Sequence, residues 1–63
     1  MKLRSYLRLE GERPAEFAAR IGASIYAVRK WLNRERIPRP KTQKIIKRAT
    51  SGKVTPEDWV SDA

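Results

Sequence analysis

The sequence predicts an all-α domain of four or five short helices, and three observations point to this class. Apolar residues recur three or four positions apart in four separate segments, which is the spacing of a helix with one buried face. Glycine, proline and helix-capping residues stand between these segments. The chain has 63 residues and no cysteine, so we expect a single domain, residues 1–63, held together by its apolar core alone or by that core and a partner subunit.

The first two helices are expected over residues 2–10 and 14–21. Gly11 and Gly22 follow them, and glycine can adopt the left-handed conformation that often ends a helix. Pro14 suits the first turn of the second helix, where its missing N–H is not needed. Their apolar stripes are Leu3, Tyr6 and Leu7, and Phe17, Ala18 and Ile21.

The third helix is expected from Ser24, which is a good N-cap, to Asn33, which can take the left-handed conformation at the end. Val28, Trp31 and Leu32 lie at i, i+3 and i+4, so they form its core face. Only residues 22–24 separate the second helix from the third. A turn this short makes the two helices cross steeply.

Prolines and a helix-capping threonine mark the elements that we expect after the third helix. Residues 37–40 are expected to be an extended connector, because residues before proline avoid the helical region, with Ile37 in the core. A fourth helix is expected over 40–49, and Thr55 and Pro56 mark the start of a fifth. The residues expected to face inward from the fourth are Ile45, Ile46 and Ala49, and the fifth carries Trp59 and Val60.

Positive charge is concentrated in one part of the chain. Fifteen Lys and Arg against seven Asp and Glu give a net charge of +8. Residues 29–48 hold nine of the basic residues and a single acid, Glu35, whereas the rest of the chain is balanced. A basic face of this kind attracts polyanions such as nucleic acid. The alternative interpretation is a solvated basic face with no ligand.

Several classes of function are not expected. With no histidine or cysteine, the chain lacks imidazole bases, thiol nucleophiles and thiolate zinc ligands. It shows no nucleophile–base pairing and no glycine-rich phosphate loop, so we expect neither an enzyme nor a cofactor. No apolar run approaches the roughly 20 residues of a membrane span, and no signal peptide is visible, so a cytoplasmic protein without a membrane partner is expected.

Several stretches together make residues 2–60 resemble the phage repressor and Cro-like (XRE-type) helix-turn-helix family. They are Ala15-Glu16-Phe17-Ala18, the Gly22-Ala23-Ser24 turn, Val28 with Trp31-Leu32-Asn33, Ile37-Pro38, and Gly52 followed by Val54-Thr55-Pro56 and Trp59. The resemblance implies a λ-repressor-like domain whose second and third helices form a helix-turn-helix. It also implies a sequence-specific transcriptional regulator, most often a repressor of phage or prophage type.

The resemblance places the third helix in the major groove of double-stranded DNA. The implied base-reading residues are Ile25, Tyr26, Ala27, Arg29 and Lys30. The implied phosphate-binding residues are Ser24, Asn33, Arg34, Arg36, Lys41 and Lys44. A homodimer on an inverted-repeat operator is expected, with half-sites about one helical turn (roughly 34 Å) apart. The possible dimer surface is Val54, Trp59 and Val60.

The chain departs from the family pattern at three places. Pro14 stands where the family usually has a glutamine that contacts a phosphate or a base, and Arg34 stands where it often has glycine. Ile25 and Tyr26 occupy positions that are usually polar. Two other functions stay open. One is a protein-interaction module on the same fold, such as an antitoxin or an accessory subunit, acting through Tyr26, Trp59 or Val60. The other is binding to RNA or to an anionic membrane surface.

Overall fold

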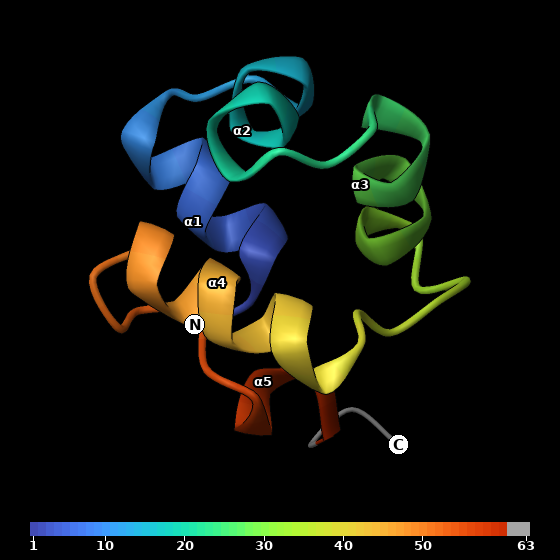
Figure 1. Ribbon diagram of the computed structural model, residues 1–63. Helices are drawn as coiled ribbons and strands as arrows, with labels where there is room; N and C mark the ends of the chain where they lie inside the picture. Colours follow the sequence, from blue (N-terminus) through green and yellow to red (C-terminus); the bar gives the residue numbers. More distant parts are fainter. Residues whose placement is uncertain (61–63) are drawn as a thin grey trace.

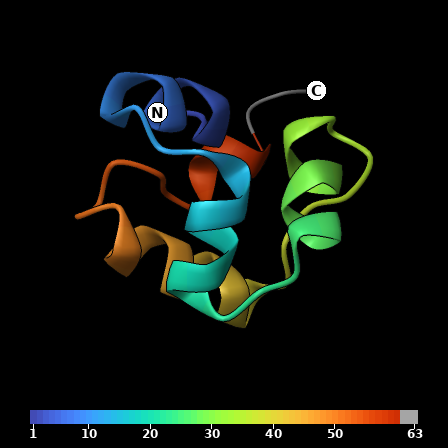
Figure 2. The same cartoon turned by 90° about the horizontal axis from the view of Figure 1, so that it is seen from above.

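The computed structural model describes residues 1–60, and this part of the chain contains five helices and no strand, as the sequence predicts. Four of the helices run for two to three turns and the last for a single turn. In both Figure 1 and Figure 2, the third helix stands at one side of the molecule. The helices are α1 (Leu3–Glu10), α2 (Pro14–Ile21), α3 (Ile25–Leu32), α4 (Pro40–Ala49) and α5 (Glu57–Val60).

The core is built around Phe17 of α2, whose side chain is fully buried. Its ring meets the ring of Tyr6 edge to face, with centroids 6.3 Å apart and planes at 62°. This is a favourable arrangement for two aromatic quadrupoles. Helix α2 packs against both α3 and α4, so it is the central element of the domain. The other buried apolar residues are Leu3, Leu7, Ala18, Val28, Trp31, Ile46 and Val54.

Each of the four longer helices is followed by a residue in the left-handed conformation: Gly11 (φ 65°), Gly22 (φ 73°), Arg34 (φ 62°) and Ser51 (φ 55°). At each of these four positions, the N–H of the following residue donates to the carbonyl of the residue five positions before it, at N···O distances of 2.8 to 3.0 Å. These bonds satisfy carbonyls that the helix leaves open. The prediction for Asn33 was wrong, because its φ is −85° and the left-handed position falls on the next residue, Arg34.

The connector before α4 differs from its prediction. Ile37 is 61% exposed, and the neighbouring Pro38 is buried in its place. The Gln43 side-chain amide donates to the Pro38 carbonyl at 2.7 Å, which fixes Pro38 against α4. Ile45 is also 41% exposed, because the inward face of α4 centres on the fully buried Ile46, and adjacent helical residues point about 100° apart.

Arg20 joins three segments of the domain. Its guanidinium donates to the Glu12 carboxylate at 2.9 and 3.0 Å, to the Ala49 carbonyl at the end of α4 at 2.8 Å, and to the Tyr6 hydroxyl at 3.3 Å. It also lies over the Phe17 ring, 5.4 Å from the centroid. The hydrogen bond to Glu12 raises the pKa of Arg20, so this cation serves the scaffold.

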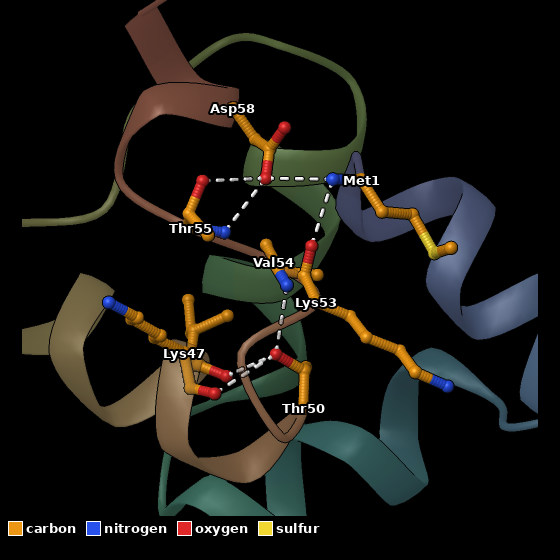
Figure 3. Close-up of polar contacts among 8 residues, drawn as sticks. Met1, Lys47, Thr50, Lys53, Val54, Thr55 and Asp58 are labelled. Atoms are coloured by element: carbon orange, nitrogen blue, oxygen red, sulfur yellow. Dashed lines mark hydrogen bonds and ion pairs between the residues drawn. The ribbon is translucent and has the colours of Figure 1, made fainter.

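The N-terminus holds α5 in place (Figure 3). The Met1 ammonium donates to the Lys53 carbonyl at 2.8 Å and to the Asp58 carboxylate at 2.9 Å. The same carboxylate oxygen accepts the Thr55 N–H and hydroxyl, at 2.8 and 3.0 Å. Partial burial raises the pKa of Asp58, but these hydrogen bonds outweigh burial and lower it overall. The helix begins at Glu57, one residue later than Pro56 predicts.

The segment before α5 is fixed by a buried hydroxyl (Figure 3). Thr50 Oγ1 donates to the Ile46 carbonyl at 2.9 Å and accepts the Val54 N–H at 3.0 Å. Val54 is fully buried, so its predicted place on a dimer surface is wrong: no face of its side chain reaches solvent. Val60 is 73% exposed, and Trp59 is half-buried against the core.

Candidate nucleic-acid interface

The turn between α2 and α3 is fixed by local hydrogen bonds. Gly22 takes the left-handed conformation after α2, and the Ala23 N–H donates to the Ala18 carbonyl at 2.9 Å. Ser24 then caps α3, because its Oγ accepts the Ala27 N–H at 3.1 Å. The first turn of α3 is therefore held firmly beside α2, and Figure 2 shows the chain passing directly from one helix to the other.

Helix α3 has one apolar face and one exposed polar face. Val28 and Trp31 are buried, at 0% and 9% exposure. The exposed face carries four side chains at i, i+3, i+4 and i+7, so they form a single stripe along the helix. This α3 stripe consists of Tyr26, Arg29, Lys30 and Asn33.

The structure separates the five predicted base-reading residues into two groups. Tyr26, at 73% exposure, and the exposed Arg29 and Lys30 lie together on the α3 stripe. Ile25 and Ala27 are only half exposed, because they border the core side of the helix, and Ala27 packs against the core itself. The outward surface of α3 is therefore more polar than the sequence predicts.

All six predicted phosphate-binding residues are exposed. They lie on three consecutive segments: the start of α3, the loop that follows it, and the first half of α4. The structure thus leaves all six of these side chains accessible to solvent. The residues are Ser24, Asn33, Arg34, Arg36, Lys41 and Lys44.

Most cations of residues 29–48 have no acidic partner in the described part of the chain. All nine are exposed, and within residues 1–60 the ion pairs between Met1 and Asp58, Arg20 and Glu12, and Lys53 and Glu10 lie outside this stretch. Eight of the nine, all except Arg34, have no hydrogen bond or ion pair from the side chain within the described residues. Uncompensated charge of one sign attracts a polyanionic partner.

Sequence reasoning missed Arg4 of α1, which contacts the end of α3. Its guanidinium donates to the Leu32 carbonyl at the end of α3, at 3.1 Å. A cation at the C-terminus of a helix also interacts favourably with the helix dipole. These residues are 28 positions apart, so no local pattern signals the contact.

The described residues show neither of two other kinds of site. No three acidic side chains in residues 1–60 lie close enough to hold a metal ion. None of the five helices is long and apolar enough to cross a bilayer.

Fold and exposure together define a class: a small helical domain in which the N-terminus of α3 is capped by Ser24 and the nine cations of residues 29–48 are exposed. A comparison with known proteins gives no closer relation, since no protein-family model, no curated protein and no solved structure matches the chain.

Proposed function

We propose that this protein is a sequence-specific double-stranded DNA-binding regulator in which α2 and α3 act as a λ-repressor-like helix-turn-helix. One observation carries the proposal. Arg29 and Lys30 lie on the exposed stripe of α3 and also begin the basic stretch of residues 29–48, in which eight of the nine cations have no partner in the described part of the chain.

In the proposed complex, α3 enters the major groove, which is about 12 Å wide and admits one helix. Arg29 and Lys30 donate hydrogen bonds to guanine O6 and N7, and the Tyr26 ring or hydroxyl contacts a neighbouring base. The basic loop and the start of α4 contact phosphates on either side. Phosphate contacts set the register and affinity, whereas base contacts set the sequence preference.

The regulator acts most simply as a repressor in the cytoplasm, by covering its operator without any enzymatic step or cofactor. A domain this small contacts only a few base pairs, so two copies on an inverted repeat are needed for high specificity. The centres of the two DNA half-sites would then lie about one helical turn of DNA, roughly 34 Å, apart.

The decisive experiment is selection from random duplex DNA at about 150 mM salt, where non-specific binding is weak. We expect an enriched inverted repeat. A bound pool that stays random at this salt concentration would refute sequence-specific binding.

Three variants then separate the roles of the residues. Lys30→Ala should lose discrimination at one base pair, by roughly 1–3 kcal/mol. Lys41→Ala should weaken all sequences equally and reduce the slope of log affinity against log salt by about 0.9. Arg8→Ala, which removes an exposed α1 cation outside the basic stretch, is the matched control and should change neither. A changed base preference in Lys41→Ala but not in Lys30→Ala would contradict these roles.

A further inference from the structure

The last four carbonyls of α3 all accept hydrogen bonds, and one of them is bound by a different helix. Carbonyls at the end of a helix have no partner within it, so other groups must satisfy them. Those of Arg29, Lys30 and Trp31 accept N–H groups of the residues that follow α3, at 2.9, 2.9 and 3.2 Å. The carbonyl of Leu32 accepts the Arg4 guanidinium of α1, at 3.1 Å. The end of α3 is therefore capped in part from outside its own segment.

Apolar packing does not fill the space beside this hydrogen bond. A groove of about 550 Å³ lies between the start of α1, the end of α3, the loop after α3, and α5. Arg4 and Leu32 both line it, so their hydrogen bond joins two of its walls. The bond thus ties α3 to α1 at a place where the side chains around it leave room for the helix to move.

The turn that Arg4 caps is the turn that carries two of the proposed base contacts. Arg29 and Lys30 are the cations of the last turn of α3. The Ser24 cap fixes the opposite end of the helix. Side chains that recognise a ligand must be held to within about 0.5 Å and 10–20° of the productive geometry. The orientation of the last turn therefore decides how well these two side chains distinguish one base from another.

We propose that Arg4 is a positioning residue for sequence recognition by α3. It binds the Leu32 carbonyl and so keeps the last turn, with Arg29 and Lys30, in one orientation on the domain, without contacting DNA itself. This inference rests on the proposed DNA binding and adds to it a determinant of specificity on α1, outside the helix-turn-helix. Loss of the bond lets the two side chains take a wider range of orientations, so that wrong bases are rejected less well.

Three roles of Arg4 give different results when its side chain is replaced. If it contacted a phosphate, its loss would weaken all sequences equally and lower the slope of log affinity against log salt by about 0.9. If it only stabilised the fold, its loss would lower the folded fraction, which reduces the affinity for every sequence by the same factor. A positioning role instead changes the ratio of the affinities for the selected site and a mismatched site, and leaves the salt slope as it is.

The test measures that ratio for the full chain, on the duplex that the native protein selects and on one changed at the base pair identified by Lys30→Ala. Arg4→Met keeps an unbranched side chain but removes the donor, and it should lower the ratio by about tenfold, the order of one base contact. Arg4→Lys keeps a charged donor and should retain most of the ratio. Arg8→Met makes the matched change at another exposed cation of α1 and should leave the ratio unchanged.

Amide hydrogen exchange tests the hold on α3 without any DNA. The N–H groups of residues 33–35 donate to carbonyls in the last turn of α3, so their exchange reports the opening of that turn. In Arg4→Met they should exchange about fivefold faster relative to the Ala27 N–H, which is bound at the Ser24 cap, because one hydrogen bond is lost at their end of the helix. Arg8→Met should keep the native pattern.

Several outcomes would overturn the proposal. They are an unchanged affinity ratio in Arg4→Met, an equal loss in Arg8→Met or Arg4→Lys, and unchanged exchange at residues 33–35. A lower salt slope in Arg4→Met would also overturn it and would make Arg4 a phosphate contact. If the native protein selects no sequence, it is the proposed function that fails. The exchange measurement would then still decide, by itself, whether Arg4 holds the last turn of α3.

Discussion

Replacing Arg34 by glycine should stabilise the domain. Arg34 follows α3 with φ 62°, a conformation in which a side chain costs about 1–2 kcal/mol relative to glycine. Glycine loses more conformational entropy on folding, which offsets about 0.5–1 kcal/mol. The net gain is therefore about 0.5–1 kcal/mol, or a rise in Tm of about 2–8 °C for a domain of this size.

Ser51→Gly is the matched control for the backbone effect. Ser51 occupies the same position after α4, with φ 55°, and should gain a similar amount. Arg34 makes a contact of its own, so Arg34→Gly should gain no more than Ser51→Gly does. Only Arg34→Gly removes a cation from the basic stretch, so only it should weaken DNA binding.

Gly22→Ala gives the opposite test. A β-carbon built on Gly22 meets no atom within 4 Å, so its effect isolates the backbone cost at φ 73°. We expect a loss of about 0.5–1 kcal/mol, because the smaller conformational entropy that alanine loses on folding offsets part of the strain of about 1–2 kcal/mol. Thermal and urea unfolding followed by circular dichroism would measure all three variants. A lower Tm in Ser51→Gly, or an unchanged one in Gly22→Ala, would refute the reasoning.

Three further predictions concern the core and the N-terminal contact. Phe17→Ala should cost about 3–5 kcal/mol, most of the stability of a domain this small, and abolish the cooperative thermal transition; a folded variant would contradict the placement of Phe17 at the centre of the core. Thr50→Val should cost about 1–3 kcal/mol in urea unfolding, because the buried Val54 N–H loses its acceptor, and an unchanged midpoint would count against that bond. The folded-state pKa of Asp58 lies below its unfolded value, so its contribution is present above about pH 4 and is lost as pH falls through the folded pKa. Asp58→Asn should therefore flatten the decline of unfolding free energy in acid, and an identical pH profile in both proteins would argue against the contact with Met1.

The sequence predicts the helices well because their signals are local. Glycine after α1 and α2, proline in the first turn of α2 and α4, and the Ser24 cap each act within one turn of their own position. The end of α3 shows where such preferences fail. Asn33 is the better left-handed residue, but α3 keeps its helical hydrogen bonding through Asn33, so the left-handed position falls on Arg34.

Burial outside the helices could not be read from apolarity alone. Neighbouring residues of an extended segment point to opposite sides, so either Ile37 or Pro38 could have faced the core. The choice depends on Gln43, whose amide binds the Pro38 carbonyl from a different element. Val54 and Val60 look equivalent in the sequence, yet the Thr50 hydroxyl holds the Val54 backbone inside the domain and leaves Val60 outside.

The division of charge within the fold follows from where the acids lie. Three acids form ion pairs with cations outside residues 29–48, and these pairs join the termini and the helix ends. The acids are Glu10, Glu12 and Asp58. Residues 29–48 contain only Glu35, which leaves their cations facing solvent. Repulsion among these cations opposes folding, and a bound polyanion removes it. Nucleic acid should therefore raise the free energy of unfolding in two ways. It makes contacts with the folded domain, and its phosphates relieve the repulsion among the cations of residues 29–48.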